Sequence, residues 1–387
     1  MDKFDDIRPY SDEEVRPTLD RVLNDSDFRR AIARLRYRRL AKWFPAPVGA
    51  VVGWYVKREL RHAQTVADVQ DVVQKYMERM MGQTMEGLSS SGLDKLNDGK
   101  AHLFVSNHRD IAMDPAFVDW VLHMNNQDTV RIAIGDNLLT MPFASDVMRL
   151  NKSFIVNRSA KGNKEKFKAL KHLSEYIHHS ITVDQADCWI AQRQGRAKDG
   201  VDRTEPALMK MFAMNRPKEQ SFADYIRELN IVPVSISYEW DPCDEAKARE
   251  RYHQQTFGEY RKGEHEDVFN LAQGIAGVKG HVHVAFGDQL VGEFNDADEL
   301  AAEIDRQIIQ NYTLQPSNCF AYKAIYGQVS DVVVGSDARP FREADFAREK
   351  RMFVRRLRAM EPKYRRYVRE MYANPVVSKL NWGVREK

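Results

Sequence analysis

Cysteine is scarce in this sequence and long apolar runs are missing from it. The cysteines lie far apart, without the paired spacing of a metal site, at Cys188, Cys243 and Cys319. A disulfide framework is therefore not expected, and this usage favours a reducing cytoplasm. The longest apolar run, residues 43–56, contains two prolines and is shorter than the roughly 20 residues of a membrane-spanning helix. Residues 1–27 are acidic and polar, unlike a signal or transit peptide, so we expect no bilayer-spanning segment.

The composition is that of a folded soluble or peripheral protein, with 43% hydrophobic and 30% charged residues. A length of 387 residues allows two or three domains. From changes in composition we expect a helical N-terminal region over residues 1–95, an α/β domain over 96–290 and a basic helical region over 291–387. The net charge of +3 is small, and we expect no nucleic-acid partner.

Cations flank an apolar segment in the N-terminal region. Residues 12–24 and 28–44 have helical patterns, and Pro45-Ala46-Pro47 follows the second. The apolar run 43–56 lies between two groups of cations: Arg29, Arg30, Arg34, Arg36, Arg38 and Arg39, then Lys57, Arg58 and Arg61. Such a segment suits the interface of an anionic bilayer. It equally suits a helical hairpin packed in the core with solvated arginines, and the sequence leaves both interpretations open.

Strand and helix patterns alternate from residue 101 onward. The strand patterns cover residues 102–105, 130–134, 153–156, 188–191, 231–238 and 281–286, with helical patterns between them. A long helix from residue 64 to about residue 88 precedes this region, and Ser89-Ser90-Ser91-Gly92 is typical of a loop. We predict an α/β fold with a layered, mostly parallel sheet, flanking helices, and helical N- and C-terminal extensions.

One strand pattern ends in a histidine that two aspartates follow. Val105-Ser106-Asn107-His108 leads through Asp110 to Asp114-Pro115 and an apolar helical pattern. In open α/β sheets ligands bind beyond the carboxyl ends of the strands, and a histidine oriented by a carboxylate can act as a general base. His108 is therefore a candidate catalytic base, with Asp114 or Asp110 as its partner. The alternative is a turn histidine with helix-capping aspartates, among which Asp114, before Pro115, would be a good N-cap.

His108-Arg109-Asp110 also occurs in the catalytic loop of protein kinases. That function requires a glycine-rich loop, a strand lysine and an Asp-Phe-Gly motif in order. Residues 1–100 contain no such loop, and no Asp-Phe-Gly follows the histidine. We therefore reject the kinase interpretation.

Two later segments carry cations at the ends of strand patterns. Residues 153–158 form a strand pattern that ends in Arg158, whose guanidinium could clamp a phosphate with two hydrogen bonds. Residues 189–200 form a strand pattern followed by cations around Gly195 (Arg193, Arg196 and Lys198), a turn that could bind phosphate. A surface arginine and an ordinary polar loop are the alternatives, and each is a common meaning of such a pattern taken alone.

In this order and spacing, the segments resemble the glycerolipid acyltransferases, which acylate glycerol 3-phosphate and lysophosphatidate. The resemblance covers residues 101–240 and joins Asn107-His108 with Asp114-Pro115 to the later strands. It implies that His108 is the catalytic base and Asp114 its orienting residue. Asp114 comes one position later than the family's aspartate, and Asp110 remains its competitor.

The resemblance also implies binding roles for the later segments. Acceptor and phosphate binding is implied for Arg158, Gln194, Gly195, Arg196 and Lys198. The loop that contains Gly195 aligns with the family pattern when one residue of that pattern is removed. Gln194 stands where the family carries a glutamate that is thought to help hold the acceptor. An amide brings hydrogen bonds but no charge, which fits a changed substrate preference, a weakened activity or an altered sequence. Val232 and Pro233, in a strand that resembles the family's Val-Pro strand, are implied to bind the acyl chain.

The implied function is that of an O-acyltransferase. It would move a fatty acyl chain from acyl-CoA or acyl carrier protein to a hydroxyl of lysophosphatidate or glycerol 3-phosphate in phospholipid synthesis. The resemblance implies no metal and no cofactor beyond this acyl donor. We expect an anionic membrane surface as a further partner and a peripheral location on the cytoplasmic face of a membrane. The alternative is a catalytically impaired acyltransferase-fold protein that binds lipid at a membrane surface.

Two features outside these segments have no implied function. Residues 342–371 are strongly basic, with apolar side chains at helical spacing. A solvated helix face is the commonest meaning of such a run, and docking on the domain or on a membrane is the alternative. His281 and His283 lie on one face of a strand pattern. Without a third ligand nearby, we expect a solvent-facing pair rather than a metal site.

Overall fold

The computed structural model describes residues 3–96, 99–139, 141–263, 266–329 and 332–385. The chain forms two compact units, each made of two separate stretches of sequence. Unit 1 contains Met1–Gly82 and Val130–His179, and unit 2 contains Gln83–Thr129 and Ser180–Lys387. The compact units therefore do not follow the three consecutive regions 1–95, 96–290 and 291–387 that composition indicates.

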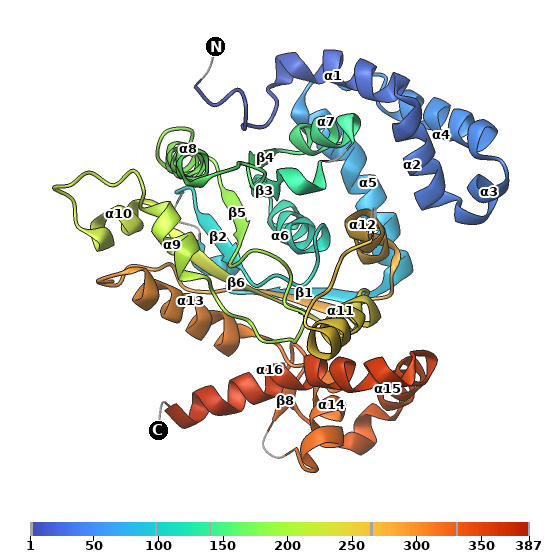
Figure 1. The fold of residues 1–387 in the computed structure, drawn as a ribbon, viewed down its shortest axis with the longest axis vertical. Helices are drawn as coiled ribbons and strands as arrows, with labels where there is room; N and C mark the ends of the chain where they lie inside the picture. Colours follow the sequence, from blue (N-terminus) through green and yellow to red (C-terminus); the bar gives the residue numbers. More distant parts are fainter. Residues whose placement is uncertain (1–2, 97–98, 140, 264–265, 330–331, 386–387) are drawn as a thin grey trace. The chain divides into compact units, whose positions relative to one another are not determined.

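The described part of unit 2 is built on a sheet of five strands (Figure 1). In spatial order they are β1 (Met85–Ser91), β7 (Gly280–Phe286), β6 (Ile231–Tyr238), β2 (Leu103–Ser106) and β5 (Cys188–Ala191). Neighbouring strands run parallel except for β6 and β7, which are antiparallel. Strands β2 and β6 are buried along their whole length, which fits the nearly continuous apolar runs that such central strands require.

The register of the central strands sets the position of the loop that carries His108. Ser106, at the end of β2, lies opposite Ala191 of β5. Because these parallel strands end at the same level, the residues that follow them emerge at one edge of the sheet. The backbone N–H of Gln192 donates to the carbonyl of Ser106 at 2.7 Å. The loops after β2 and β5 therefore start next to each other.

Residues 85–91 form a strand, so the prediction of a helix that continues to about residue 88 is wrong. Helix α5 (Val66–Thr84) ends before them, and from Met85 the chain pairs in parallel with β7. Gly87 permits close packing, because a Cβ atom there would lie 2.9 Å from Nδ1 of His281. Long-range strand pairing therefore overrides the local helical pattern.

The presence of β1 changes the surroundings of one histidine of β7. His283 is 5% exposed, and the hydroxyls of Ser89 and Ser91 lie 2.7 and 3.0 Å from its two ring nitrogens. Burial lowers the pKa of His283 to about 4. The expectation of a solvent-facing pair holds for the exposed His281 and is wrong for His283, because a strand that the sequence pattern did not indicate covers it.

Unit 1 combines a parallel strand pair, β3 (Arg131–Gly135) with β4 (Ser153–Val156), with helices. The described helices are α1 (Asp12–Asn24), α2 (Ser26–Arg36), α3 (Arg38–Trp43), α4 (Pro45–Glu59), α5, α7 (Pro142–Leu150) and α8 (Asn163–Thr182). Apolar side chains of α1, α2, α4 and α7 share one core. The single helix predicted over residues 28–44 is divided, because Tyr37 leaves the helical region at φ −130° and ψ 51°.

The basic C-terminal segment belongs to the core of unit 2. It contains α15 (Ala347–Ala359) and α16 (Arg365–Arg385), which follow α14 (Pro316–Tyr326). Phe353 of α15 and Tyr372 of α16 pack against Trp240, which lies just after β6. Arg356 forms an ion pair with Asp244, at the start of α11 (Asp244–Phe257). One face of α15 is therefore docked on the α/β core.

Further helices connect and flank the strands of unit 2 (Figure 1). They are α6 (Met113–Met124), α9 (Pro206–Phe212), α10 (Phe222–Glu228), α12 (Glu266–Ala276) and α13 (Ala297–Asn311). Mostly parallel strands with helices between them confirm the predicted α/β fold class. Within the described ranges, no helix combines the length and the apolar character needed to cross a membrane.

Candidate active site

A side-chain amide fixes the start of the loop after β2. Asn107 Nδ2 donates to the carbonyl of Ile236 at 3.0 Å, and the backbone N–H of Ile236 donates to Asn107 Oδ1 at 2.8 Å. Asn107 is fully buried, so water does not compete for these bonds. The amide therefore fixes the point at which the chain leaves the sheet, and His108 follows directly.

His108 and Asp114 form the central pair of the site. Nδ1 of the imidazole lies 3.0 Å from Oδ2 of Asp114, whose side chain is 0% exposed. A carboxylate oxygen accepts hydrogen bonds, so in this contact Nδ1–H is the donor and Oδ2 of Asp114 the acceptor. Nε2 has no hydrogen-bond partner in the part of the chain that the structure describes. Nε2 therefore offers a free lone pair, as a general base requires.

Three further donors hold the Asp114 carboxylate in place. The backbone N–H groups of Arg109 and Asp110 donate to Oδ2 at 2.6 and 2.9 Å, and the hydroxyl of Tyr238 donates to Oδ1 at 2.7 Å. Burial and the charge of Asp114 raise the pKa of Tyr238 well above its usual value. The phenol therefore keeps its proton and remains a donor. Sequence reasoning missed Tyr238, because only the fold brings the end of β6 to this loop.

Asp110 has a different role from Asp114. Its Oδ1 accepts the backbone N–H groups of Ala112 and Met113 at 3.0 and 2.9 Å, at the start of α6. Its Oδ2 is buried without a hydrogen-bond partner in the described structure. Burial and the neighbouring Asp114 raise the pKa of Asp110. Of the two aspartates, only Asp110 therefore accepts N–H groups at the start of α6, and Asp114 contacts the imidazole instead of capping the helix.

A buried ionic network lies behind the loop. Arg109 Nη2 donates to Asp202 Oδ2 at 2.6 Å, with both side chains almost fully buried. Lys247 of α11 donates from Nζ to the carbonyl of Arg109 at 2.6 Å and forms an ion pair with Asp241. Burial opposes ionisation of Asp241, but Lys247 lowers its pKa overall. Asp202, Asp241 and Lys247 carry no motif in the sequence, and their common position results from tertiary packing.

The loop after β5 packs against the histidine loop. The backbone N–H of Ala197 donates to the carbonyl of His108 at 2.8 Å. Gln194 and Gly195 are exposed, and Gly195 has a φ of +78°, a left-handed conformation that favours glycine. The backbone N–H of Gln194 donates to Oε2 of Glu205 at 3.2 Å. A carboxylate therefore lies next to the position where the family carries its glutamate.

Helix α16 supports the far end of the same loop. Gly200 has a φ of +76°, and a Cβ atom at this position would collide with the carbonyl of Met371. Nδ2 of Asn374 donates to the carbonyl of Asp199 at 2.7 Å. The C-terminal helices therefore contribute to the position of the predicted phosphate-binding turn.

The two cations of this turn have different surroundings. Arg196 is buried near Asp110, Asp241 and Cys243, and its Nη1 lacks a hydrogen-bond partner within the described structure. Burial opposes the charge of Arg196, but these neighbours raise its pKa overall. Lys198 forms an ion pair with Glu250 of α11. Arg196 therefore has a free N–H group for a ligand, whereas Lys198 already has a carboxylate partner.

The remaining predicted site residues lie elsewhere. Arg158 belongs to unit 1, where its backbone N–H donates to Asp136 Oδ1 at 3.0 Å and its side chain lies exposed along Gly135. Val232 and Pro233 are buried in the middle of the sheet of unit 2. The structure thus brings together His108, Asp114 and the loop 192–200, and it describes Arg158 within the other unit.

Residues 88–191 match the family model described as Acyltransferase. The match confirms the resemblance over this segment, which includes His108, Asp110, Asp114 and Arg158 and ends just before the loop that carries Gln194. No curated protein matches the chain. A similar solved structure is the 1-acyl-sn-glycerophosphate (LPA) acyltransferase, PlsC, from Thermotoga maritima, with 14% identity, coverage of 73% of this chain and 95% of that chain, and a TM-score of 0.37.

Proposed function

We propose that the chain is an O-acyltransferase that moves a fatty acyl chain from acyl-CoA or acyl carrier protein to a hydroxyl of lysophosphatidate or glycerol 3-phosphate in phospholipid synthesis. One observation carries the proposal: within the segment that matches the Acyltransferase family, Nδ1 of His108 is bonded to the buried Asp114. A hydroxyl is a weak nucleophile until a base removes its proton. In this proposal, Nε2 of His108 is that base.

In the proposed reaction, Nε2 of His108 takes the proton of the acceptor hydroxyl while that oxygen attacks the thioester carbonyl carbon. Asp114 stabilises the imidazolium, and Tyr238 holds the Asp114 carboxylate in position. The tetrahedral intermediate then collapses as its C–S bond breaks, and the leaving thiolate takes the proton from Nε2. The products are the acylated acceptor and the free thiol of the donor. The reaction uses no covalent enzyme intermediate, metal or further cofactor.

The acceptor phosphate is proposed to bind at Gln194, Gly195, Arg196 and Lys198, and the phosphate-binding role of Arg158, which belongs to unit 1, stays a prediction. The buried and unpartnered Nη1 of Arg196 supports this assignment, because a phosphate oxygen would satisfy it. For Lys198 to contribute, the phosphate must replace Glu250 as its partner. Val232 and Pro233 are proposed to contact the acyl chain, which must then reach the interior of the sheet.

The test is His108→Ala, assayed by thiol release and by acylated product with each donor and each acceptor. Loss of the base is expected to lower the turnover number by about 100- to 10,000-fold. His281→Ala, a change at an exposed histidine of the same unit, should keep wild-type turnover. Unchanged turnover in folded His108→Ala would overturn the mechanism. A wild-type protein that turns over no donor and still binds lysophosphatidate would favour the catalytically impaired lipid-binding module.

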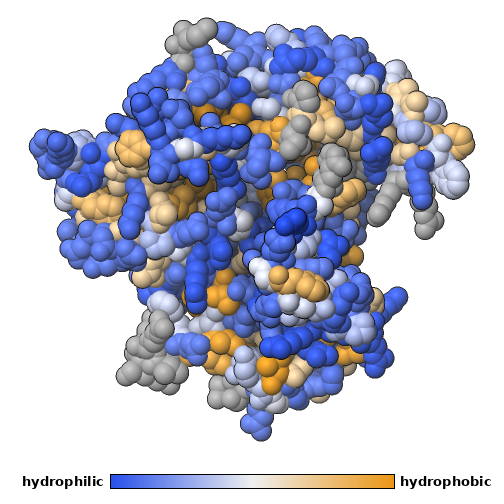
Figure 2. All heavy atoms as spheres, viewed as in Figure 1, coloured by the Kyte–Doolittle hydropathy of each residue, from blue (hydrophilic) through white to orange (hydrophobic). Residues whose placement is uncertain are grey.

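We infer that α3 and α4 of unit 1 contact the membrane that holds the lipid substrate. One face of α4 is buried in the core, whereas Trp43 and Trp54 are 77% and 63% exposed. Leu40, Phe44 and Val51 are exposed with them, and Figure 2 shows hydrophobic surface over these helices. Lys42, Lys57 and Arg58 are among the described cations of these helices, while the side chains of Arg36, Arg38 and Arg39 lie outside the described residues. Such a surface suits an anionic bilayer interface.

The membrane contact is tested by sedimentation with vesicles that contain anionic phospholipid. The triple change Trp43→Ser, Phe44→Ser and Trp54→Ser should weaken binding by roughly tenfold or more, because each side chain loses apolar area that the bilayer would bury. The matched control is Phe257→Ser, Val291→Ser and Tyr326→Ser, a set of exposed apolar residues in unit 2. Equal binding by both triple variants would contradict the assignment to α3 and α4.

A further inference from the structure

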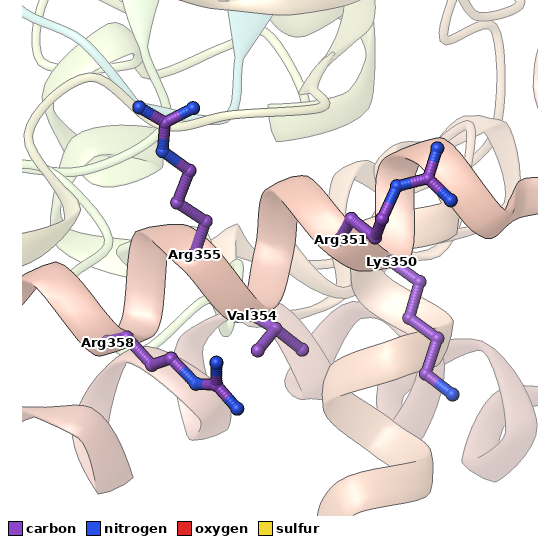
Figure 3. A pocket seen from close by; sticks show the side chains of 5 residues that line it. All are labelled: Lys350, Arg351, Val354, Arg355 and Arg358. Atoms are coloured by element: carbon purple, nitrogen blue, oxygen red, sulfur yellow. The ribbon is translucent and has the colours of Figure 1, made fainter.

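Helix α15 carries a strongly cationic surface beside a hollow of about 340 Å³. Figure 3 shows the side chains that line it, which are Lys350, Arg351, Val354, Arg355 and Arg358. The four cations among them are exposed, and together they are called the cationic ridge below. Since α15 rises about 1.5 Å per residue, the ridge is about 12 Å long.

The opposite face of α15 holds the helix firmly in unit 2. Phe353 and Leu357 are buried in the C-terminal core. Between them, Arg356 donates to the carbonyl of Asp241 at 2.7 Å and to Asp244 Oδ1 at 2.9 Å. The ridge is therefore a fixed surface rather than part of a loose tail.

The three arginines of the ridge have no acidic partner among the described residues, whereas Lys350 of the ridge pairs with Glu343. Arg348 pairs with Glu86, and Arg366 pairs with Glu370. In contrast, Arg351, Arg355 and Arg358 form no ion pair with any described residue, and their guanidinium groups point in different directions (Figure 3). Like charges three and four residues apart repel each other on a helix. A row of unpaired arginines therefore weakens α15 unless a polyanion binds to it.

The ridge lacks the apolar component of a membrane contact. Among the described residues of α15, no large hydrophobic side chain is exposed, in contrast to α3 and α4. Proteins that lie on a bilayer usually combine cations with inserted apolar or aromatic groups. A hollow lined by cations is also better matched by a protruding acidic element than by a planar surface. These observations favour an acidic protein over a lipid surface.

The ridge belongs to the same unit as His108. Arg356 of α15 binds the carbonyl of Asp241, the Asp241 carboxylate pairs with Lys247, and Lys247 donates to the carbonyl of Arg109, next to His108. The surface and the catalytic loop are thus held by one buried network.

We propose that the cationic ridge docks the acyl donor in the form of an acidic carrier protein that bears the chain as a thioester. This inference rests on the proposed function, and it selects the carrier protein rather than acyl-CoA as the donor that the surface recognises. An acidic helix of the carrier would lie against α15 and be held by complementary charge, which salt screens.

The test uses the full chain with Arg351→Gln, Arg355→Gln and Arg358→Gln, assayed with palmitoyl-acyl carrier protein and with palmitoyl-CoA. The KM for the carrier-bound donor should rise at least tenfold with little change in kcat, and the KM for palmitoyl-CoA should change less than twofold. Binding of labelled acyl carrier protein, measured by fluorescence anisotropy, should weaken equally in the triple variant made with and without His108→Ala. The control is Lys95→Gln, Lys210→Gln and Lys218→Gln, which removes three exposed charges elsewhere in unit 2.

Several outcomes would overturn the inference. An equal rise in KM for palmitoyl-CoA would mean that the ridge binds the phosphates of a small donor. Loss of binding to anionic vesicles with an unchanged KM for the carrier would assign the ridge to a membrane. Unchanged anisotropy in the ridge variant would make it a solvated surface. If the wild-type chain uses neither donor, the proposed acyltransfer fails, and the anisotropy measurement alone then decides whether the ridge binds the carrier.

Discussion

Asp114 reaches His108 although it comes one position later than the family's aspartate. It lies in the first turn of α6, where side chains tilt back toward the N-terminus of the helix. The intervening residues curl around its carboxylate, and two of their N–H groups donate to Oδ2. The extra residue therefore forms part of the carboxylate's binding loop and does not displace the carboxylate from the imidazole.

This geometry separates the roles of the two aspartates. Asp114→Asn should lower kcat by about 100- to 10,000-fold, because the imidazolium loses its counter-charge and Nδ1 loses its acceptor. Asp110→Asn should lower kcat less than about tenfold and reduce the free energy of unfolding by about 1 kcal/mol, as expected for a weakened helix cap. Steady-state kinetics and urea unfolding of both variants provide the check. The reverse order of kinetic effects would make Asp110 the orienting residue.

At the level of elements, strand β1 determines the surroundings of His283 in the neighbouring strand β7. It covers β7 on the side where β6 does not pair, and its serines satisfy both nitrogens of the buried His283. A buried imidazole with two hydroxyl partners is more stable neutral than charged, because burial penalises the charge. The stability of the pairing between β1 and β7 should therefore depend on pH.

The pKa of His283 is lowered from 6.5 to about 4 in the folded chain. Between these values the unfolded chain binds a proton and the folded chain does not, so stability is present above pH 6.5 and is lost as the pH falls toward about 4. The loss attributable to His283 should reach about 3 kcal/mol. Urea unfolding from pH 7.5 to 4.5 should show a steeper decline for the wild type than for His283→Asn. His281→Asn, at an exposed position, should retain the wild-type slope, and parallel curves for all three proteins would refute the assignment.

At the level of the whole molecule, the C-terminal helices are part of unit 2 rather than an appendage. Their aromatic side chains pack on Trp240 just after β6, and Asn374 holds the loop that contains the predicted phosphate-binding residues. The sequence match to the Acyltransferase family ends at residue 191. The conformation of the site therefore depends on helices far outside the matched segment.

Arg356→Met tests this dependence. It leaves Asp244 buried without its cation, which should reduce the free energy of unfolding of unit 2 by roughly 3 kcal/mol or more. Arg355→Met, at the adjacent exposed position, should change it by less than about 0.5 kcal/mol. Denaturant unfolding followed by tryptophan fluorescence is the measurement. Equal stability of the two variants would show that the C-terminal helices fold independently of the α/β core.

Local patterns predicted much of the fold and part of the site. The strand patterns at 153–156, 188–191 and 231–238 coincide with β4, β5 and β6, because continuous apolar runs between turn residues specify buried strands. His108 was recognisable from its place after one such strand. Tyr238 was not recognisable as a site residue, because its contact with Asp114 joins residues 124 positions apart. No motif around Tyr238 in the sequence indicates a functional side chain.

The sequence by itself determined the alternation of strands and helices, the position of His108 after a buried strand, and the resemblance that the family match confirms over residues 88–191. These are local properties, set by side-chain periodicity and by turn residues over short stretches. Only the tertiary structure decided which aspartate contacts the imidazole, that residues 85–91 pair with β7, and which arginines remain unpaired. Those outcomes depend on burial and on contacts between residues distant in the chain, and such contacts form only when the units are packed.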